Sequence, residues 1–119
     1  MKDSLGQELE RGDVILITID TPVEHPAQLV IYLSNKEIVY DVTEDGVEST
    51  KTINTIKYYP LSEEGLEVAK HDAGVVVRNF HRTKGFEVTN MEPRHLRKFN
   101  PGSLMGYVKS IYDSITALL

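Results

Sequence analysis

The chain has 119 residues, the size of a single domain, and its 40% apolar and 26% charged residues are ordinary for a globular protein. It has no cysteine, which excludes disulfides, thiolate catalysis and cysteine-based zinc sites. No apolar leader opens the sequence, and no apolar run approaches the roughly 18 residues of a membrane span, so we expect a cytoplasmic protein without a membrane partner.

The net charge of −5 is unevenly distributed along the chain. Residues 1–50 hold eleven acidic and three basic residues, whereas residues 78–98 hold six basic and two acidic ones. The local field, and not the total charge, decides which ions approach a surface. The basic segment 78–98 is therefore where an anionic partner would bind.

Three strands are predicted first, over residues 13–19, 28–33 and 37–42. A two-residue loop at Asn35-Lys36 would join the second and third strands and place their apolar residues on one face. Asp45-Gly46 offers a second tight turn, because glycine tolerates positive φ. The segment 48–55, rich in Thr and Ser, is expected to be an edge strand or a mobile loop. The predicted hairpin pairs are Leu33 with Ile38, Ile31 with Tyr40 and Leu29 with Val42.

The entry Leu9-Glu10-Arg11-Gly12-Asp13-Val14 before the first strand resembles that of SH3-like small barrels of the KOW kind. The resemblance covers about residues 5–42 and implies a small platform for nucleic acid or protein partners. It assigns no functional residue. The chain after residue 42 is longer than one closing barrel strand requires.

The middle of the chain predicts a short strand, a helix and two further strands. Residues 56–61 form the first strand, which Pro60 ends. Ser62 then caps a helix over residues 63–73 that stops at Gly74, although Gly65 weakens it. Strands over 75–77 and 86–89 are expected to pair with each other. Residues 93–98 form either a short helix that begins at Pro93, or a brief helical turn before a closing strand over 95–99.

The C-terminal segment 101–118 predicts an amphipathic helix, with Asn100 as cap and Pro101 in the first turn. Two interpretations are open. The helix packs on its own sheet, or it docks a partner or a second copy in a homodimer. The residues that would form this contact are Leu104, Val108, Ile111 and Ile115.

Motifs of catalysis and cofactor binding are missing from the sequence. It contains no phosphate-binding glycine loop, dinucleotide fingerprint or catalytic serine motif. The four histidines, His25, His71, His81 and His95, lack the spacing of metal ligands. We therefore expect no cofactor and no metal. A third, least favoured hypothesis is an acid–base enzyme that uses His81, His95 and Lys84, because histidine titrates near neutral pH.

The basic segment gives the leading hypothesis. Its cations alternate with Phe80 and Phe86 and adjoin Phe99, and cations beside stacking rings are the parts of a sequence-tolerant nucleic-acid site. The alternative is that the phenylalanines belong to the core and the bases form a solvated face. The predicted nucleic-acid contacts are Arg78, Arg82, Lys84, Arg94, Arg97 and Lys98.

The competing function is a regulatory or inhibitory module that docks on a larger protein through its acidic face or its C-terminal helix. The predicted fold class is α+β in one domain over residues 1–119. It consists of a bent antiparallel sheet or small SH3-like β-barrel, mostly within residues 5–99, a short inserted helix and the C-terminal amphipathic helix.

Overall fold

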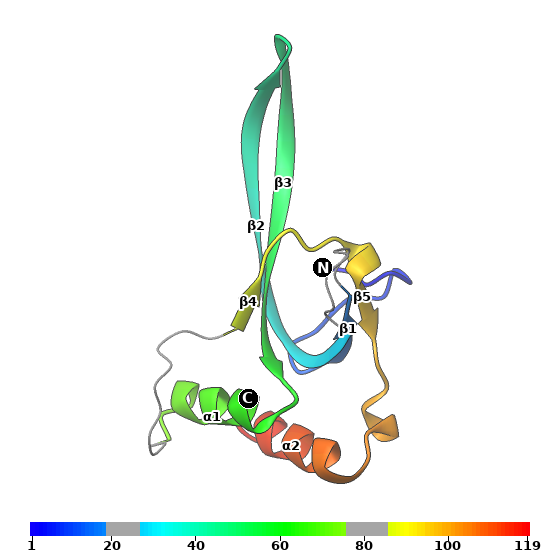
Figure 1. Cartoon of the computed structure of the whole chain (residues 1–119), viewed down its shortest axis with the longest axis vertical. Coiled ribbons are helices and arrows are strands. Elements are labelled where there is room, and N and C mark those ends of the chain that lie inside the picture. The colour runs from blue at the N-terminus through cyan, green and yellow to red at the C-terminus, as the bar shows by residue number, and fades with distance from the viewer. Residues whose placement is uncertain (19–26, 76–85) are drawn as a thin grey trace.

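The computed structural model describes residues 1–18, 27–75 and 86–119. These residues form an α+β fold with an open, five-stranded antiparallel sheet in the order β4-β3-β2-β1-β5 (Figure 1). The strands are β1 (Val14–Ile17), β2 (Gln28–Glu44), β3 (Val47–Pro60), β4 (Phe86–Val88) and β5 (Leu96–Lys98). The α-helices are α1 (Glu63–Asp72) and α2 (Gly106–Thr116), and two 3₁₀ turns span Pro93–His95 and Pro101–Ser103.

The predicted α+β class with an antiparallel sheet and two helices is confirmed, but the sheet does not close into a barrel. The edge strands β4 and β5 have three residues each and lie at opposite ends of the strand order. Strand β4 pairs with only a short part of the long strand β3, and β5 pairs with Ile15–Ile17 of β1. Among the described helices, none is long and apolar enough to cross a membrane.

The predicted hairpin at Asn35-Lys36 is wrong, because β2 continues through these residues. Asn35 pairs with Ile56, and the chain turns ten residues later at Asp45-Gly46. Both turn residues have positive φ, 50° and 76°, as a type I′ turn requires. Asp and Gly tolerate that conformation, whereas Asn35-Lys36 offers no glycine. The segment 48–55 is consequently the first half of the long strand β3.

The two faces of the sheet carry separate apolar clusters. Neighbouring side chains on a strand point to opposite faces, so Val30 enters one cluster and Ile31 the other. The helices α1 and α2 contact each other. Their buried residues pack with Ile31 and Tyr59 of the sheet in the second cluster. The first cluster is Leu9, Ile15, Ile17, Val30, Tyr32, Ile56, Met91 and Leu96. The second is Ile31, Tyr59, Val68, Ala69, Ile111 and Ile115.

The predicted helix after Ser62 is confirmed as α1. The Ser62 hydroxyl accepts a hydrogen bond from the backbone N–H of Gly65 at 3.3 Å. At the other end, the Tyr59 hydroxyl donates to Asp72 at 2.5 Å and fastens the helix to β3. Burial, followed by this hydrogen bond to a carboxylate, raises the pKa of Tyr59 above its ordinary value of 10.0.

The last third of the chain differs from its prediction at the start of α2. Asn100 and Pro101 cap a single 3₁₀ turn, and α2 begins only at Gly106, whose φ of 59° redirects the chain. Residues 93–98 adopt the second alternative, a brief helical turn followed by the strand β5. Strand β4 pairs with β3, while residues 76 and 77 of the strand expected to pair with it lie outside the described residues.

Candidate interaction surface

The far halves of β2 and β3 project from the body as a two-stranded arm, defined here as residues 36–53 (Figure 1). Strand β1 accompanies β2 only to Ile31, and β4 accompanies β3 only to Ile56. The arm makes the molecule elongated, with extents of 54 × 31 × 28 Å. No residue of the arm is buried. No other layer of the described fold supports the arm. An isolated hairpin gains little stability from its own packing.

One face of the arm is apolar, and we call it the apolar face. Directly paired residues share a face of a hairpin, and the register pairs Ile38 with Ile53, Tyr40 with Lys51 and Val42 with Ser49. Val47 extends the same face to the tip. The exposed fractions are 46% for Ile38 and 65% for Val47, although both are large apolar residues. The members of the apolar face are Ile38, Tyr40, Val42, Val47 and Ile53.

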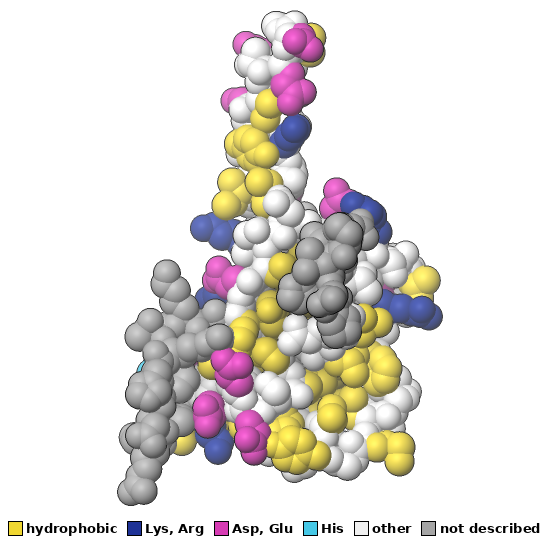
Figure 2. Space-filling view, viewed as in Figure 1, with side chains coloured by type: hydrophobic (Ala, Val, Ile, Leu, Met, Phe, Trp, Pro, Cys, Tyr) yellow, Lys and Arg dark blue, Asp and Glu magenta, His cyan; other side chains and the backbone are white. Residues whose placement is uncertain are grey.

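The opposite face of the arm is polar and acidic. Its residues include Glu37, Asp41 and Glu48, interspersed with threonines, and Val39 is its exposed apolar exception. Figure 2 shows hydrophobic side chains gathered along the arm and acidic side chains toward its tip. The arm is thus amphipathic in the way a strand is when one side packs against another layer.

A hollow of about 520 Å³ lies where the apolar face meets the body. Ser34 and Lys36 of β2, Thr55 and Lys57 of β3, and Glu87 of β4 are among the residues that line it. Two lysines against one carboxylate make it locally positive, in contrast to the acidic tip. The apolar face therefore has a basic end at the body and an acidic end at the turn.

The described part of the predicted nucleic-acid segment does not form a cluster of free cations. The Arg94 guanidinium Nε lies 2.6 Å from a carboxylate oxygen of Glu92, and Lys98 Nζ lies 3.3 Å from Asp13. Arg97 is exposed on β5, with no ion pair among the described residues. Arg78, Arg82 and Lys84 lie outside the described residues. Two of the three described cations therefore carry a local counter-charge.

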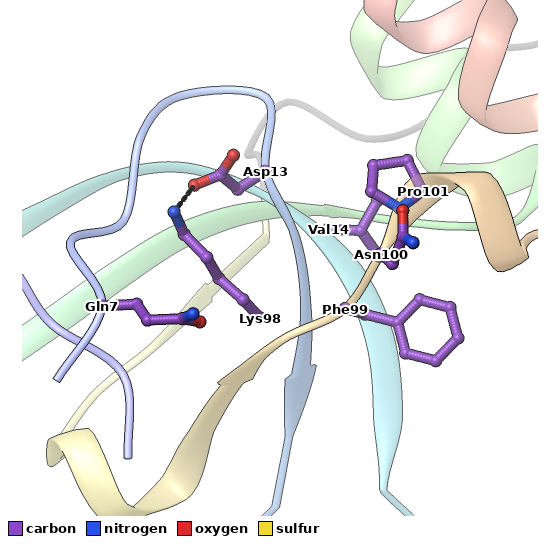
Figure 3. Close-up of a pocket in the computed structure, with 7 residues that line it drawn as sticks. All are labelled: Gln7, Asp13, Val14, Lys98, Phe99, Asn100 and Pro101. Carbon is purple, nitrogen blue, oxygen red and sulfur yellow. Dashed lines mark ion pairs between the residues drawn. The ribbon is translucent and has the colours of Figure 1, made fainter. Parts of the chain in front are cut away.

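A second hollow, of about 360 Å³, surrounds the Lys98–Asp13 ion pair (Figure 3). Gln7 lies beside Lys98 in this view, whereas Phe99 points to the opposite side. The same Asp13 carboxylate oxygen that contacts Lys98 accepts the backbone N–H of Glu10 at 2.8 Å. These contacts hold the turn before β1 against β5, and both charged groups are satisfied within the chain. We assign this hollow a structural role.

The residues predicted to dock a partner through the C-terminal helix lie mainly in the interior. Leu104, Ile111 and Ile115 are 5%, 4% and 0% exposed, and the two isoleucines join the cluster beneath the sheet. This is the first of the two interpretations of the helix. A buried side chain meets a partner only if the fold opens, so of the four residues Val108, 37% exposed, is the one on the surface.

The described histidines show no catalytic arrangement. His95 is buried, and its Nδ1 accepts the backbone N–H of Glu92 at 3.0 Å, which shapes the turn before β5. His71 is exposed near the end of α1. His25 and His81 lie outside the described residues. Within the described ranges, no group of three or more His, Asp or Glu side chains is placed to hold a metal ion.

The sequence prediction missed the apolar face because it paired residues 38–42 with 29–33 in a short hairpin. The Asp45-Gly46 turn was the signal in the sequence that could have revealed this face. If the chain turns there and not at Asn35-Lys36, residues 36–53 form a hairpin that extends beyond the predicted body of the sheet. Comparisons with protein-family models, with curated proteins and with solved structures found no match to this chain.

Proposed function

We propose that this protein is a non-enzymatic interaction module that binds a protein chain through the apolar face of its arm. The observation that carries the proposal is a hairpin with one apolar side that nothing in the described fold covers. Contiguous exposed apolar surface is characteristic of binding sites, and its burial contributes roughly 25 cal/mol per Å². The acidic flank of the arm favours a protein partner and disfavours a polyanion.

The test compares two neighbouring residues on opposite faces of the arm. Ile38→Lys places a charge on the apolar face, and Val39→Lys makes the same change on the polar face, where Val39 is 60% exposed. Immobilised full-length protein is incubated with lysate, and captured proteins, the chain's own copies included, are quantified by crosslinking and mass spectrometry. Ile38→Lys is expected to weaken capture about tenfold or more, as loss of an apolar interface anchor does.

The Val39→Lys variant is expected to bind like the wild type. Thermal melting checks that both variants fold, since exposed strand substitutions usually change stability by less than about 0.5 kcal/mol. Equal binding by the wild type and both variants would refute the apolar face as the binding surface.

A second candidate function is nucleic-acid binding by the segment 78–98. The observation in its favour is Arg97, an exposed cation on the edge strand β5. If it holds, binding to mixed-sequence oligonucleotides falls steeply with salt, and Arg97→Glu weakens it. Lys109→Glu on α2 is the matched control outside the segment. Absence of oligonucleotide binding at about 50 mM salt would rule this function out.

The relation to SH3-like small barrels is part of the proposal. In support, the entry residue Leu9 lies in the core, and the β1 that follows it sits between β2 and β5. We interpret the fold as an open variant in which the long arm takes the place of a closed barrel wall. Such barrels are binding platforms, which agrees with a module that acts by docking.

A further inference from the structure

We propose that the chain seated on the apolar face is the arm of a second copy of this protein. The two arms lie antiparallel and face to face, and the tip of each rests in the hollow at the base of the other. This inference rests on the proposed function and names its partner. A contact of this kind is isologous, because the same surface is used by both copies.

The apolar face pairs with itself in this orientation, apart from Lys51 at its centre. From base to tip its paired rows are Lys36–Thr55, Ile38–Ile53, Tyr40–Lys51, Val42–Ser49 and Glu44–Val47. Reversing one arm over the other sets the Ile38–Ile53 row of each copy against the Val42–Ser49 row of the other. It also sets the two Tyr40–Lys51 rows against each other, where the two Lys51 side chains face each other and each keeps its own Glu44 at 3.8 Å. The same reversal brings Lys36 of each copy near Glu44 and Asp45 of the other. A parallel arrangement would instead place the two acidic tips together.

The charges at the two ends of the arm select the antiparallel arrangement. Glu44 and Asp45 lie at the turn, where Glu44 also pairs with Lys51 of the same arm at 3.8 Å and Glu48 lies on the polar face. Lys36 and Lys57 line the basal hollow together with the single carboxylate of Glu87. The net charge of −5 on each chain opposes association. Exposed charges more than about 8–10 Å apart are largely screened at physiological salt, so the local contacts outweigh the distant repulsion.

The dimensions of the arm allow the contact. Nine residue steps separate Lys36 from the turn, which at about 3.3 Å per residue gives an arm of roughly 30 Å. Two antiparallel arms of this length overlap completely and keep the two bodies at opposite ends. The hollow of about 520 Å³ has room for the Asp45 side chain and the backbone of Gly46.

Sedimentation velocity of the purified full-length protein tests the inference through a charge exchange. Lys36→Glu and Glu44→Lys are each expected to raise the dimer dissociation constant about tenfold or more, and the double variant is expected to restore it to near the wild-type value. Glu37→Lys is the matched control, because Glu37 adjoins Lys36 but lies on the opposite face. This control is expected to dimerise like the wild type.

Two results would overturn the inference: a wild-type chain that stays monomeric up to about 1 mM, or a dimer that neither charge reversal weakens. Either result leaves the proposed function standing if Ile38→Lys still abolishes capture of another protein. A monomeric chain with no capture that depends on Ile38 refutes both proposals.

Discussion

Replacing Gly65 with alanine is expected to destabilise the protein by about 3 kcal/mol, although alanine is the better helix former. Gly65 lies buried in the first turn of α1. A Cβ atom there would lie 1.9 Å from the carbonyl oxygen of Pro60 and 2.9 Å from its carbonyl carbon. Both are backbone atoms at the end of β3, so the helix must move, and with it Val68 and Ala69 in the core.

Urea unfolding of Gly65→Ala beside Glu67→Ala measures this effect. Glu67 is exposed in the same helix, so its substitution is expected to change the free energy of unfolding by less than about 0.5 kcal/mol. Helix propensity alone would make Gly65→Ala more stable by about 1 kcal/mol. A stabilised Gly65→Ala variant would therefore show that α1 does not approach β3 as closely as described.

Removing the Asp3 carboxylate is expected to cost about 3 kcal/mol, because it takes away the acceptor of three backbone hydrogen bonds. Asp3 is 2% exposed. One of its carboxylate oxygens accepts the N–H groups of Leu5 at 3.0 Å and Gln7 at 2.8 Å, and the other accepts that of Lys98 at 3.0 Å. This single side chain ties the N-terminal segment to the edge strand β5. In Asp3→Ala all three donors lose their acceptor.

The same carboxylate makes stability depend on pH. Burial by itself would raise the pKa of Asp3, but the three backbone donors and the Lys98 charge outweigh it and lower the pKa below the ordinary 3.8. The unfolded chain therefore takes up this proton first as the pH falls. The contribution of Asp3 is full above the unfolded pKa and is lost as the pH falls through the folded pKa.

Urea unfolding of the wild type, Asp3→Ala, Asp3→Asn and Asp113→Asn between pH 7 and pH 3 checks both statements. The stability difference between wild type and Asp3→Asn should be constant from pH 7 to about pH 5 and shrink below about pH 4. Asp113 is an exposed carboxylate on α2, and its variant should follow the wild type throughout. A difference that grows on acidification would contradict the lowered pKa.

Local signals in the sequence predicted local structure well. The α1 helix follows from the Ser62 cap and the Gly74 stop, and the helical spacing of Ile111 and Ile115 marks the buried side of α2. The start of α2 escaped prediction because Asn100-Pro101 is also a good start for a single 3₁₀ turn. The positive φ of Gly106 marks the later start of α2. The sequence does not reveal it, because glycine adopts positive and negative φ about equally readily.

The register of β2 escaped prediction for a non-local reason. Alternating apolar residues on both sides of Asn35-Lys36 fit a short hairpin as well as one continuous strand. The register shift in β2 between Tyr32 and Ser34 also breaks the alternation that the sequence displays. What decides between the two is the pairing of β2 with β1 and β3, which a local pattern does not contain.

The basic segment illustrates the same limit. Composition counts Lys98 as an available cation, but its counter-ion Asp13 is far away in sequence and reaches it only because β5 pairs with β1. Conversely, Ile38 and Tyr40 look like core residues until the turn is placed at Asp45-Gly46. Both the exposure of the apolar face and the ion pairing of the cations thus depend on the topology of the sheet.

The continuous arm is tested most directly by a cysteine pair, since the chain has no cysteine of its own. Val39 and Thr52 are exposed and directly opposite each other in the arm, and facing positions in an antiparallel pair have the Cα separation that a disulfide requires. Val39→Cys combined with Thr52→Cys should oxidise to an intrachain disulfide in dilute, folded protein. The short hairpin would place Val39 opposite Tyr32, so two thiols that stay free under oxidising conditions would contradict the arm and every proposal made from it.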